Sequence, residues 1–258
     1  MRLSMTTCAI ALTAGTALSS PPGPGNTNSF VDAPRIFNDF PGTSLTFASD
    51  YGAGTVAIDE TGYPGSSFAN RHAAWFAGNN NGTKIDVDYF DSFTIRTTMS
   101  ISQTGTVGNI EAGIQADLFG FGLFGVLTAN GEIAAFGSTN PFYSFGTGLY
   151  NLGDEIMLEM IHTPGAGEFS GTPSTLEYRY NNLTTGSGWV SSGQIAYTNL
   201  EGGIITAFPQ HYGVGAQFNN PGSDAVIGLR FWDTSMVPAP GTAALLGLGG
   251  LVAARRRR

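Results

Sequence analysis

The chain has 258 residues, including 37 glycines, 18 phenylalanines and nine tyrosines, and only 12% of its residues are charged. Nineteen acidic residues against eleven basic ones give a formal charge of −8 at pH 7, which argues against nucleic acid and anionic lipid as partners. The single cysteine, Cys8, lies near the N-terminus, so thiol catalysis and cysteine-based metal sites are excluded for the rest of the chain.

The first 20 residues have the layout of a secretory signal peptide. Arg2 precedes an apolar stretch over 8–18, and small residues surround the expected cleavage site at 17–20. A disordered or buried N-terminus is the alternative. The next segment, 21–29, is rich in proline, glycine and asparagine and is predicted to be an extended or disordered linker.

A β-domain is expected over 30–236. Its composition, with many glycines and aromatic residues and few charges, is typical of short strands joined by tight turns. Without the two ends, the chain keeps all 19 acidic residues but only six basic ones, a formal charge of about −13. This length is enough for one large β-domain with a continuous core.

The clearest predicted strand covers 91–103, where apolar Phe93, Ile95 and Met99 alternate with polar residues. No convincing amphipathic helix precedes residue 241, so we predict an all-β antiparallel sandwich. Further strands are predicted over 35–40, 44–47, 54–59, 71–76, 110–117, 121–128, 133–136, 154–163, 175–180, 194–197, 212–218 and 225–233.

This order of strands resembles a concanavalin A-like or laminin-G-like jelly roll. The residues that carry the resemblance are the long strand over 91–103, the hairpin at Asn130-Gly131 and the strand introduced by Leu152-Gly153-Asp154. The final strand, 225–233, would close the fold. A resemblance of this kind concerns the fold and not the activity.

The last 22 residues, 237–258, have three parts. A proline-bracketed motif precedes an uncharged run of 14 residues, and four arginines end the chain. As a helix the run spans about 21 Å of a hydrocarbon core about 30 Å thick, and arginine stems that reach back to the headgroups lengthen it. The arginines orient such a helix with the preceding chain outside. The alternative is a buried core helix with a basic tail.

This three-part order resembles the PEP-CTERM sorting signal of bacterial exported proteins, although an alanine stands where that family usually has glutamate. The resemblance implies recognition by an exosortase-type membrane peptidase, transient attachment to the inner membrane, removal of the tail and delivery to the cell surface or extracellular matrix. The residues that carry it are Val237, Pro238, Ala239, Pro240, Arg255, Arg256, Arg257 and Arg258.

Two carboxylates offer the sharpest catalytic candidate. Glu155 and Glu159 share one face of a predicted strand, the arrangement that a glycosidase needs for its acid and its nucleophile. The stretch resembles the Glu-x-Asp-x-Glu strand of family 16 glycoside hydrolases, but Met157 stands at the central aspartate. A half-buried strand with an acidic solvent face is the simpler interpretation, so no residue is assigned a catalytic role.

Two binding hypotheses remain. Asp86, Asp88 and Asp91 offer hard oxygen ligands at close spacing, which makes calcium a candidate cofactor, with solvated carboxylates as the alternative. Trp189 lies in a loop rich in threonine, glycine and serine and is expected to be partly exposed, so that it could stack on a sugar ring. We therefore predict a non-enzymatic structural or adhesive protein of the cell surface or extracellular matrix, with polysaccharide as a candidate ligand; a secreted polysaccharide hydrolase using Glu155 and Glu159 is the alternative.

Overall fold

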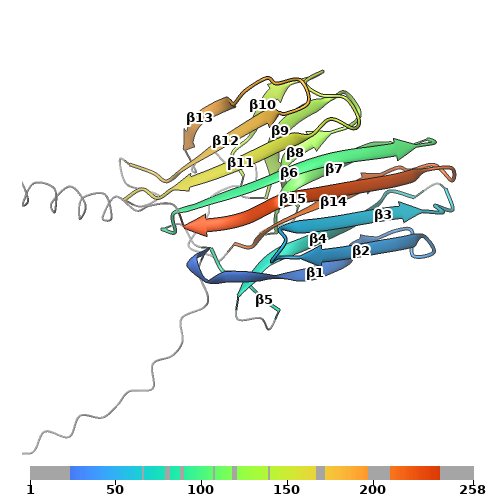
Figure 1. Cartoon of the computed structure of the whole chain (residues 1–258), viewed down its shortest axis with the longest axis horizontal. Coiled ribbons are helices and arrows are strands. Elements are labelled where there is room, and N and C mark those ends of the chain that lie inside the picture. Colours follow the sequence, from blue (N-terminus) through green and yellow to red (C-terminus); the bar gives the residue numbers. More distant parts are fainter. Residues whose placement is uncertain are drawn as a thin grey trace, which may run out of the picture.

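Two antiparallel sheets pack face to face in the computed structural model of the chain (Figure 1). The all-β sandwich predicted from the sequence, a β-sandwich of jelly-roll type, is therefore confirmed. The predicted signal helix over 1–20 and the predicted sorting helix after 240 lie outside the described residues. Within the described part, no helix has the length and apolar character needed to cross a membrane. The structure describes residues 24–65, 67–78, 82–87, 90–106, 108–117, 121–138, 140–166, 172–196 and 210–238.

The first sheet, sheet A, places strands together that are far apart in the sequence. Its order is β1-β4-β14-β7-β8-β9-β10, and the short β5 also pairs with the end of β4, at Ala77 and Gly78. Because β14 inserts between β4 and β7, side chains from three distant segments share one face. The bounds are β1 Thr27–Asn38, β4 Ala69–Gly78, β5 Thr83–Lys84, β7 Asn109–Ala116, β8 Gly122–Leu127, β9 Glu132–Gly137, β10 Tyr143–Gly146 and β14 Tyr212–Asn219.

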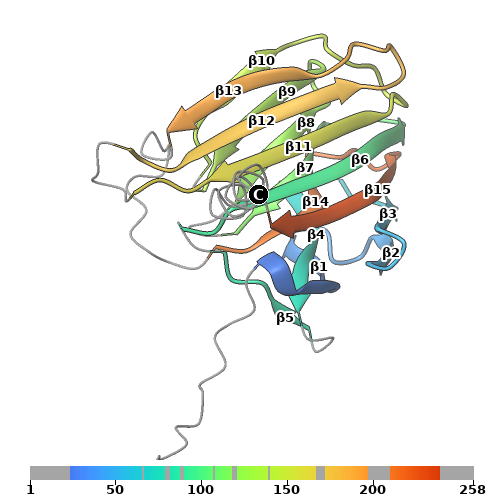
Figure 2. The same ribbon diagram turned by 60° about the vertical axis from the view of Figure 1, so that its left-hand side comes forward.

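The second sheet, sheet B, has the order β13-β12-β11-β6-β15-β3-β2. Figure 2 shows β13, β12, β11 and β6 side by side in this layer. All its described pairings are antiparallel, so neighbouring residues on one face stand directly opposite each other. The bounds are β2 Ser44–Asp50, β3 Thr55–Thr61, β6 Phe93–Thr104, β11 Ile156–Thr163, β12 Thr175–Asn182, β13 Val190–Ala196 and β15 Val226–Pro238.

The two ends of the sandwich correct the expected boundaries. A 3-10 turn covers Pro24–Asn26 and β1 starts at Thr27, inside the segment predicted as a linker. Pairing with β4 outweighs the proline- and glycine-rich composition there. At the other end β15 continues to Pro238, two residues beyond the expected limit of the domain, because Val237 and Pro238 pair with β6.

The core lies between the sheets and follows the predicted alternation. On β6 the side chains of Phe93, Ile95, Met99 and Ile101 are at most 3% exposed and point toward sheet A. On β4 every residue is buried, so both faces of that strand are covered. Period-two alternation therefore identifies β6 in the sequence, whereas β4 has no such signal.

A buried polar cluster joins the two sheets inside the core. Glu60 of β3 accepts hydrogen bonds from Asn70 Nδ2 (2.7 Å), from Tyr63 Oη (2.8 Å) and from Thr43, and His72 Nε2 lies 3.0 Å from its Oε2. Burial raises the pKa of Glu60, but the hydrogen bonds from His72, Thr43 and Tyr63 outweigh it and hold that pKa below its ordinary value. The carboxylate is fully satisfied, and we assign it a structural role.

Candidate functional site

The outer face of sheet B carries an ion-pair cluster centred on Glu159. In the strand register, Glu159 of β11 stands directly opposite Arg96 of β6 and Arg179 of β12. Arg96 donates from Nε (3.0 Å) and Nη2 to one carboxylate oxygen, and Arg179 donates from Nη1 (3.3 Å) to the other. The Glu159 side chain is 5% exposed, whereas those of Arg96 and Arg179 are 48% and 36% exposed. We call these three residues the Glu159 cluster.

These contacts bear directly on the hydrolase alternative. Glu155 lies one residue before β11 and is exposed, and both oxygens of Glu159 already accept hydrogen bonds from arginine. A general acid must carry a proton that it can give to the leaving group. The geometry therefore disfavours Glu159 as the acid of a glycosidase.

Trp189 projects from the turn between β12 and β13 beside the Glu159 cluster. Its side chain is 46% exposed, which confirms the predicted exposure. The Arg96 guanidinium lies 5.8 Å from the centroid of its ring. The turn is held by Asn182, whose Oδ1 accepts from the Thr185 N–H (3.1 Å) and whose own N–H donates to Ser187 Oγ (3.0 Å). The exposed indole is thus presented by an ordered turn.

The outer face of sheet A contains a different arrangement around Arg71. The Nε of Arg71, on β4, donates to Gln115 Oε1 of β7 at 3.2 Å. Arg71 is 8% exposed and Gln115 is fully buried. The guanidinium carbon lies 4.5 Å from the Phe121 ring centroid and 6.0 Å from that of Trp75. The Nη2 of Arg71 is buried and has no hydrogen-bond partner among the residues that the structure describes.

A glycine makes this contact possible. Arg71 pairs with Gln217 on β14, whereas Gln115 pairs with Gly213 further along the same strand, so the Arg71 side chain crosses the sheet diagonally past Gly215. A Cβ at Gly215 would lie 2.1 Å from the His72 carbonyl oxygen and 3.0 Å from Gln115 Nε2. Only glycine leaves this space open.

Four charged side chains surround one end of the same face. His211 Nδ1 lies 3.0 Å from Asp117 Oδ1, its Nε2 lies 3.0 Å from Asp86 Oδ1, and Lys84 Nζ lies 2.6 Å from Asp117 Oδ2. The hydrogen bond with Asp117 raises the pKa of His211 despite its burial. Burial raises the pKa of Asp117, but hydrogen bonds from His211 and Lys84 outweigh it and lower that pKa. These charges satisfy one another.

The calcium hypothesis and the sorting motif are only partly covered by the structure. Asp86 is bound to His211, the main-chain carbonyl of Asp91 is hydrogen-bonded to His162, and Asp88 lies outside the described residues. Among the described residues no group of three or more acidic, histidine or cysteine side chains is arranged to hold a metal ion. Calcium stays a prediction.

Of the sorting motif, only Val237 and Pro238 are described; Ala239, Pro240 and the four arginines, Arg255, Arg256, Arg257 and Arg258, lie outside.

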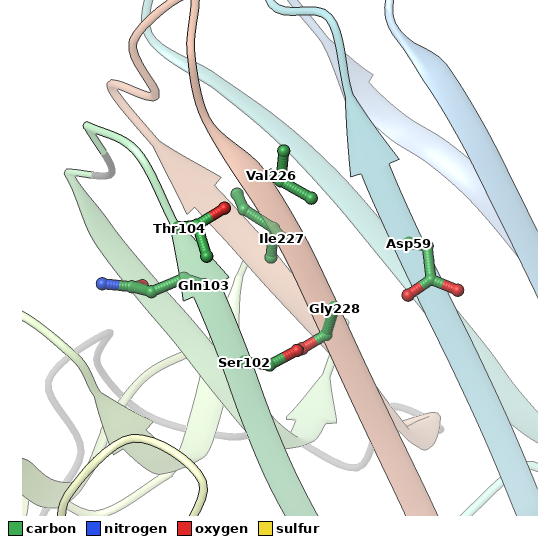
Figure 3. Close-up of a pocket in the computed structure, with 7 residues that line it drawn as sticks. All are labelled: Asp59, Ser102, Gln103, Thr104, Val226, Ile227 and Gly228. Carbon is green, nitrogen blue, oxygen red and sulfur yellow. The ribbon is translucent and has the colours of Figure 1, made fainter.

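A shallow depression of about 320 Å³ lies on the outer face of sheet B between β3, β15 and β6 (Figure 3). Gly228 forms its floor, between Asp59 and Ser102. Arg230 holds both oxygens of Asp59, at 2.8 Å and 2.9 Å. Because Asp59 is already paired, this depression offers no free charged group to a ligand.

The comparisons with known proteins concern the fold. No family model and no curated protein sequence matches the chain. Among solved structures, the chain is similar to the alginate lyase from Klebsiella pneumoniae (12% identity, 84% of this chain and 99% of that one, TM-score 0.46). It is also similar to a functionally unknown protein from Saccharomyces cerevisiae (13%, 77% and 97%, TM-score 0.45) and to lectin II from Ulex europaeus (8%, 82% and 99%, TM-score 0.34). At these values the likeness carries no argument about activity, and the sandwich is established by its own strand pairing.

Proposed function

We propose that this chain is an exported protein of the cell surface or extracellular matrix whose sandwich binds polysaccharide at Trp189. The export part rests on the sequence, with a signal peptide over 1–20 and a sorting tail over 237–258 that an exosortase-type peptidase would recognise at the inner membrane. The binding part rests on one observation, the half-exposed Trp189 beside Arg96 on an ordered turn. A structural or adhesive role follows from the two together.

The chemistry around Trp189 suits a sugar ring. An indole offers a flat apolar face on which the C–H groups of a pyranose can stack, and it loses little side-chain entropy on binding. Arg96 uses Nε and Nη2 for Glu159, and Arg179 uses Nε for Glu177 and Nη1 for Glu159. Each guanidinium therefore keeps a further nitrogen that can donate to a hydroxyl group.

The Glu159 cluster supports the binder rather than the hydrolase. Because Glu159 fixes both arginines before a ligand arrives, less conformational entropy is lost on binding. The same pairing occupies the carboxylate that a hydrolytic mechanism would need. The proposal therefore assigns Glu159 to positioning and includes no catalytic step.

The binding part is tested by replacing the indole. The mature protein recovered from the cell-surface fraction and its Trp189→Ala variant are applied to immobilised polysaccharides. Phe142→Ala is the matched control, because Phe142 is also an exposed aromatic residue, at 55%, but follows β9 in sheet A. We expect Trp189→Ala to lose binding and Phe142→Ala to keep it. Equal binding by all three proteins would remove the role of Trp189.

The export part is tested by fractionation and intact mass. We expect the mature protein outside the cytoplasm, shorter than the 258-residue precursor at both ends. A full-length protein inside the cell, with its four terminal arginines still attached, contradicts the sorting role. That result would leave the saccharide-binding test unaffected.

A further inference from the structure

Among the lysine and arginine side chains of the described residues, Arg71 differs from the others because it forms no ion pair. No described carboxylate lies within ion-pair distance of its guanidinium, although the mature protein is strongly acidic. The other lysine and arginine side chains all form ion pairs: Arg35 with Glu60, Lys84 with Asp117, Arg96 and Arg179 with Glu159, and Arg230 with Asp59. The one unpaired cation is also the most buried of the six.

An unpaired buried charge is costly for a folded protein. Desolvation of a cation is repaid only by an opposite charge or by a full set of hydrogen bonds. Within the described part of the chain, the Arg71 guanidinium makes a single hydrogen bond, from Nε to Gln115, and its buried Nη2 makes none. Burial lowers the pKa of Arg71, and the charge of Asp117 only partly opposes this. An arrangement of this kind is expected where a ligand completes the charge pair.

We infer that Arg71 and Gln115 form a binding site for a ligand carboxylate on the outer face of sheet A, on the opposite side of the sandwich from Trp189. A guanidinium and a carboxylate are both planar, and they pair through two parallel N–H···O bonds. Arg71 Nη2 donates to one carboxylate oxygen. Gln115 Nε2 has only a 3.5 Å contact with the His72 carbonyl and is free to donate to the other.

The neighbouring charges select a single negative charge. Lys84 and His211 already neutralise Asp117, so Asp117 does not satisfy Arg71. Glu111, on the same face of β7, is engaged by Asn109. A carboxylate matches the single unpaired cation, whereas a dianion such as phosphate would bring a second charge close to Asp117 and Glu111.

Access runs past Phe121. This ring lies over the guanidinium at 4.5 Å, and Nη2 is buried. Trp75 is 1% exposed and fixed within β4, whereas Phe121 is only partly buried and precedes β8. The ligand therefore enters where the Phe121 ring turns aside, and the two aromatic rings then exclude water from the new ion pair.

The carboxylate can belong to an acidic sugar or to a small organic acid. Calorimetric titration of the mature protein with trigalacturonate, with its methyl ester and with sodium acetate separates these sources. The methyl ester keeps the sugar frame and removes the charge. We expect trigalacturonate to bind about 10- to 100-fold more tightly than the ester. Acetate binding as tightly as trigalacturonate assigns the site to a small acid.

Arg71→Met is the decisive variant, with Arg230→Met as the matched control, because it removes an arginine from the other sheet. We expect Arg71→Met to lose the carboxylate-dependent binding and Arg230→Met to keep it. A purely structural role predicts a lower thermal midpoint for Arg71→Met without ligand, whereas the binding site predicts a higher one, since an unpaired buried charge is removed. Binding unchanged by Arg71→Met, no binding of any carboxylate, or a lowered midpoint overturns the inference.

The inference and the proposed function fail independently. Trp189 and Arg71 lie on opposite outer faces, so Trp189→Ala is expected to leave carboxylate binding unchanged. Loss of binding to both kinds of probe in one variant would indicate unfolding, which the thermal midpoint detects.

Discussion

Arg96 and Arg179 on the outer face of sheet B share a carboxylate partner, whereas Arg71 on the outer face of sheet A has no ion-pair partner among the described residues. On sheet B, Arg96 and Arg179 stand in register with Glu159, and both carboxylate oxygens are used. On sheet A, Arg71 stands in register with the uncharged Gln217 and Phe37, and it reaches diagonally to Gln115. Directly opposed residues on antiparallel strands are the ones that pair. Register therefore places Glu159 against Arg96 and Arg179 and leaves Arg71 opposite uncharged residues, although Arg230 of β15 still reaches Asp59, which is not directly opposite it.

The difference assigns distinct tasks to the arginines. Arg96 and Arg179 on sheet B are both held by Glu159, and Arg96 lies beside Trp189, so their charge supports a surface that is complete in the free protein. Arg71 on sheet A has no ion-pair partner among the described residues and is the group that the proposed ligand would meet.

Gly215→Ala is expected to have the largest effect. Its Cβ would lie 2.1 Å from the His72 carbonyl oxygen, a main-chain atom that can move only if the sheet moves. We expect a loss of about 3 kcal/mol in the free energy of unfolding, measured by urea denaturation. Gly228→Ala is the matched variant on sheet B.

At Gly228 the nearest atom to the added Cβ is Ser102 Oγ, at 2.7 Å, which belongs to a side chain that can rotate. The expected loss there is about 1 kcal/mol or less. Equal losses in the two variants would show that the floor of sheet A is no more constrained than that of sheet B.

Glu159→Gln is expected to cause the second-largest loss in the free energy of unfolding. Glutamine keeps the shape but removes the charge that Arg96 and Arg179 share, so we expect a loss of about 2 kcal/mol at pH 7. The half-exposed arginines recover some hydration, which keeps the loss below that of a fully buried pair. Urea unfolding measures the loss, and a change below about 0.5 kcal/mol contradicts the pairing in the Glu159 cluster.

A β-glucan assay on the same two proteins checks the hydrolase alternative, which requires activity in the parent that the variant lacks.

His211→Gln tests the charged cluster near Arg71 through the pH dependence of stability. The pKa of His211 is raised in the folded state, so its contribution to stability is complete below the unfolded value near 6.5 and is lost as pH rises through the folded value. The pKa of Asp117 is lowered, so its contribution is lost only as pH falls through that lower value. We expect the parent to lose on the order of 1 kcal/mol above pH 6.5. Thermal midpoints of the variant should be flatter across this range, and parallel curves would contradict the assignment.

Local pattern predicts the strands that have one solvent face, but it does not predict the open site. The strand predicted over 91–103 is β6, Phe93–Thr104, because burial on one face imposes alternation. The start of β1 was missed because proline and glycine dominate the composition where pairing with β4 decides the structure. Arg71 and Gln115 are 44 residues apart, and they meet only because β14 inserts between their strands. No spacing in the sequence records that insertion, whereas the exposure of Trp189 follows from its own loop.

Asp59→Asn is expected to have the smallest effect, and it calibrates the others. Arg230 holds both oxygens of Asp59, but the two side chains are 51% and 40% exposed, so solvent screens the pair. We expect a loss of at most about 0.5 kcal/mol, and less at 1 M salt, by urea unfolding at both ionic strengths. A loss as large as that of Glu159→Gln would mean that burial does not separate the two pairs. In that case the burial of an arginine would not determine how much its charge contributes to the free energy of unfolding. The energetic cost assigned to the buried, unpaired Arg71 would then lose its basis.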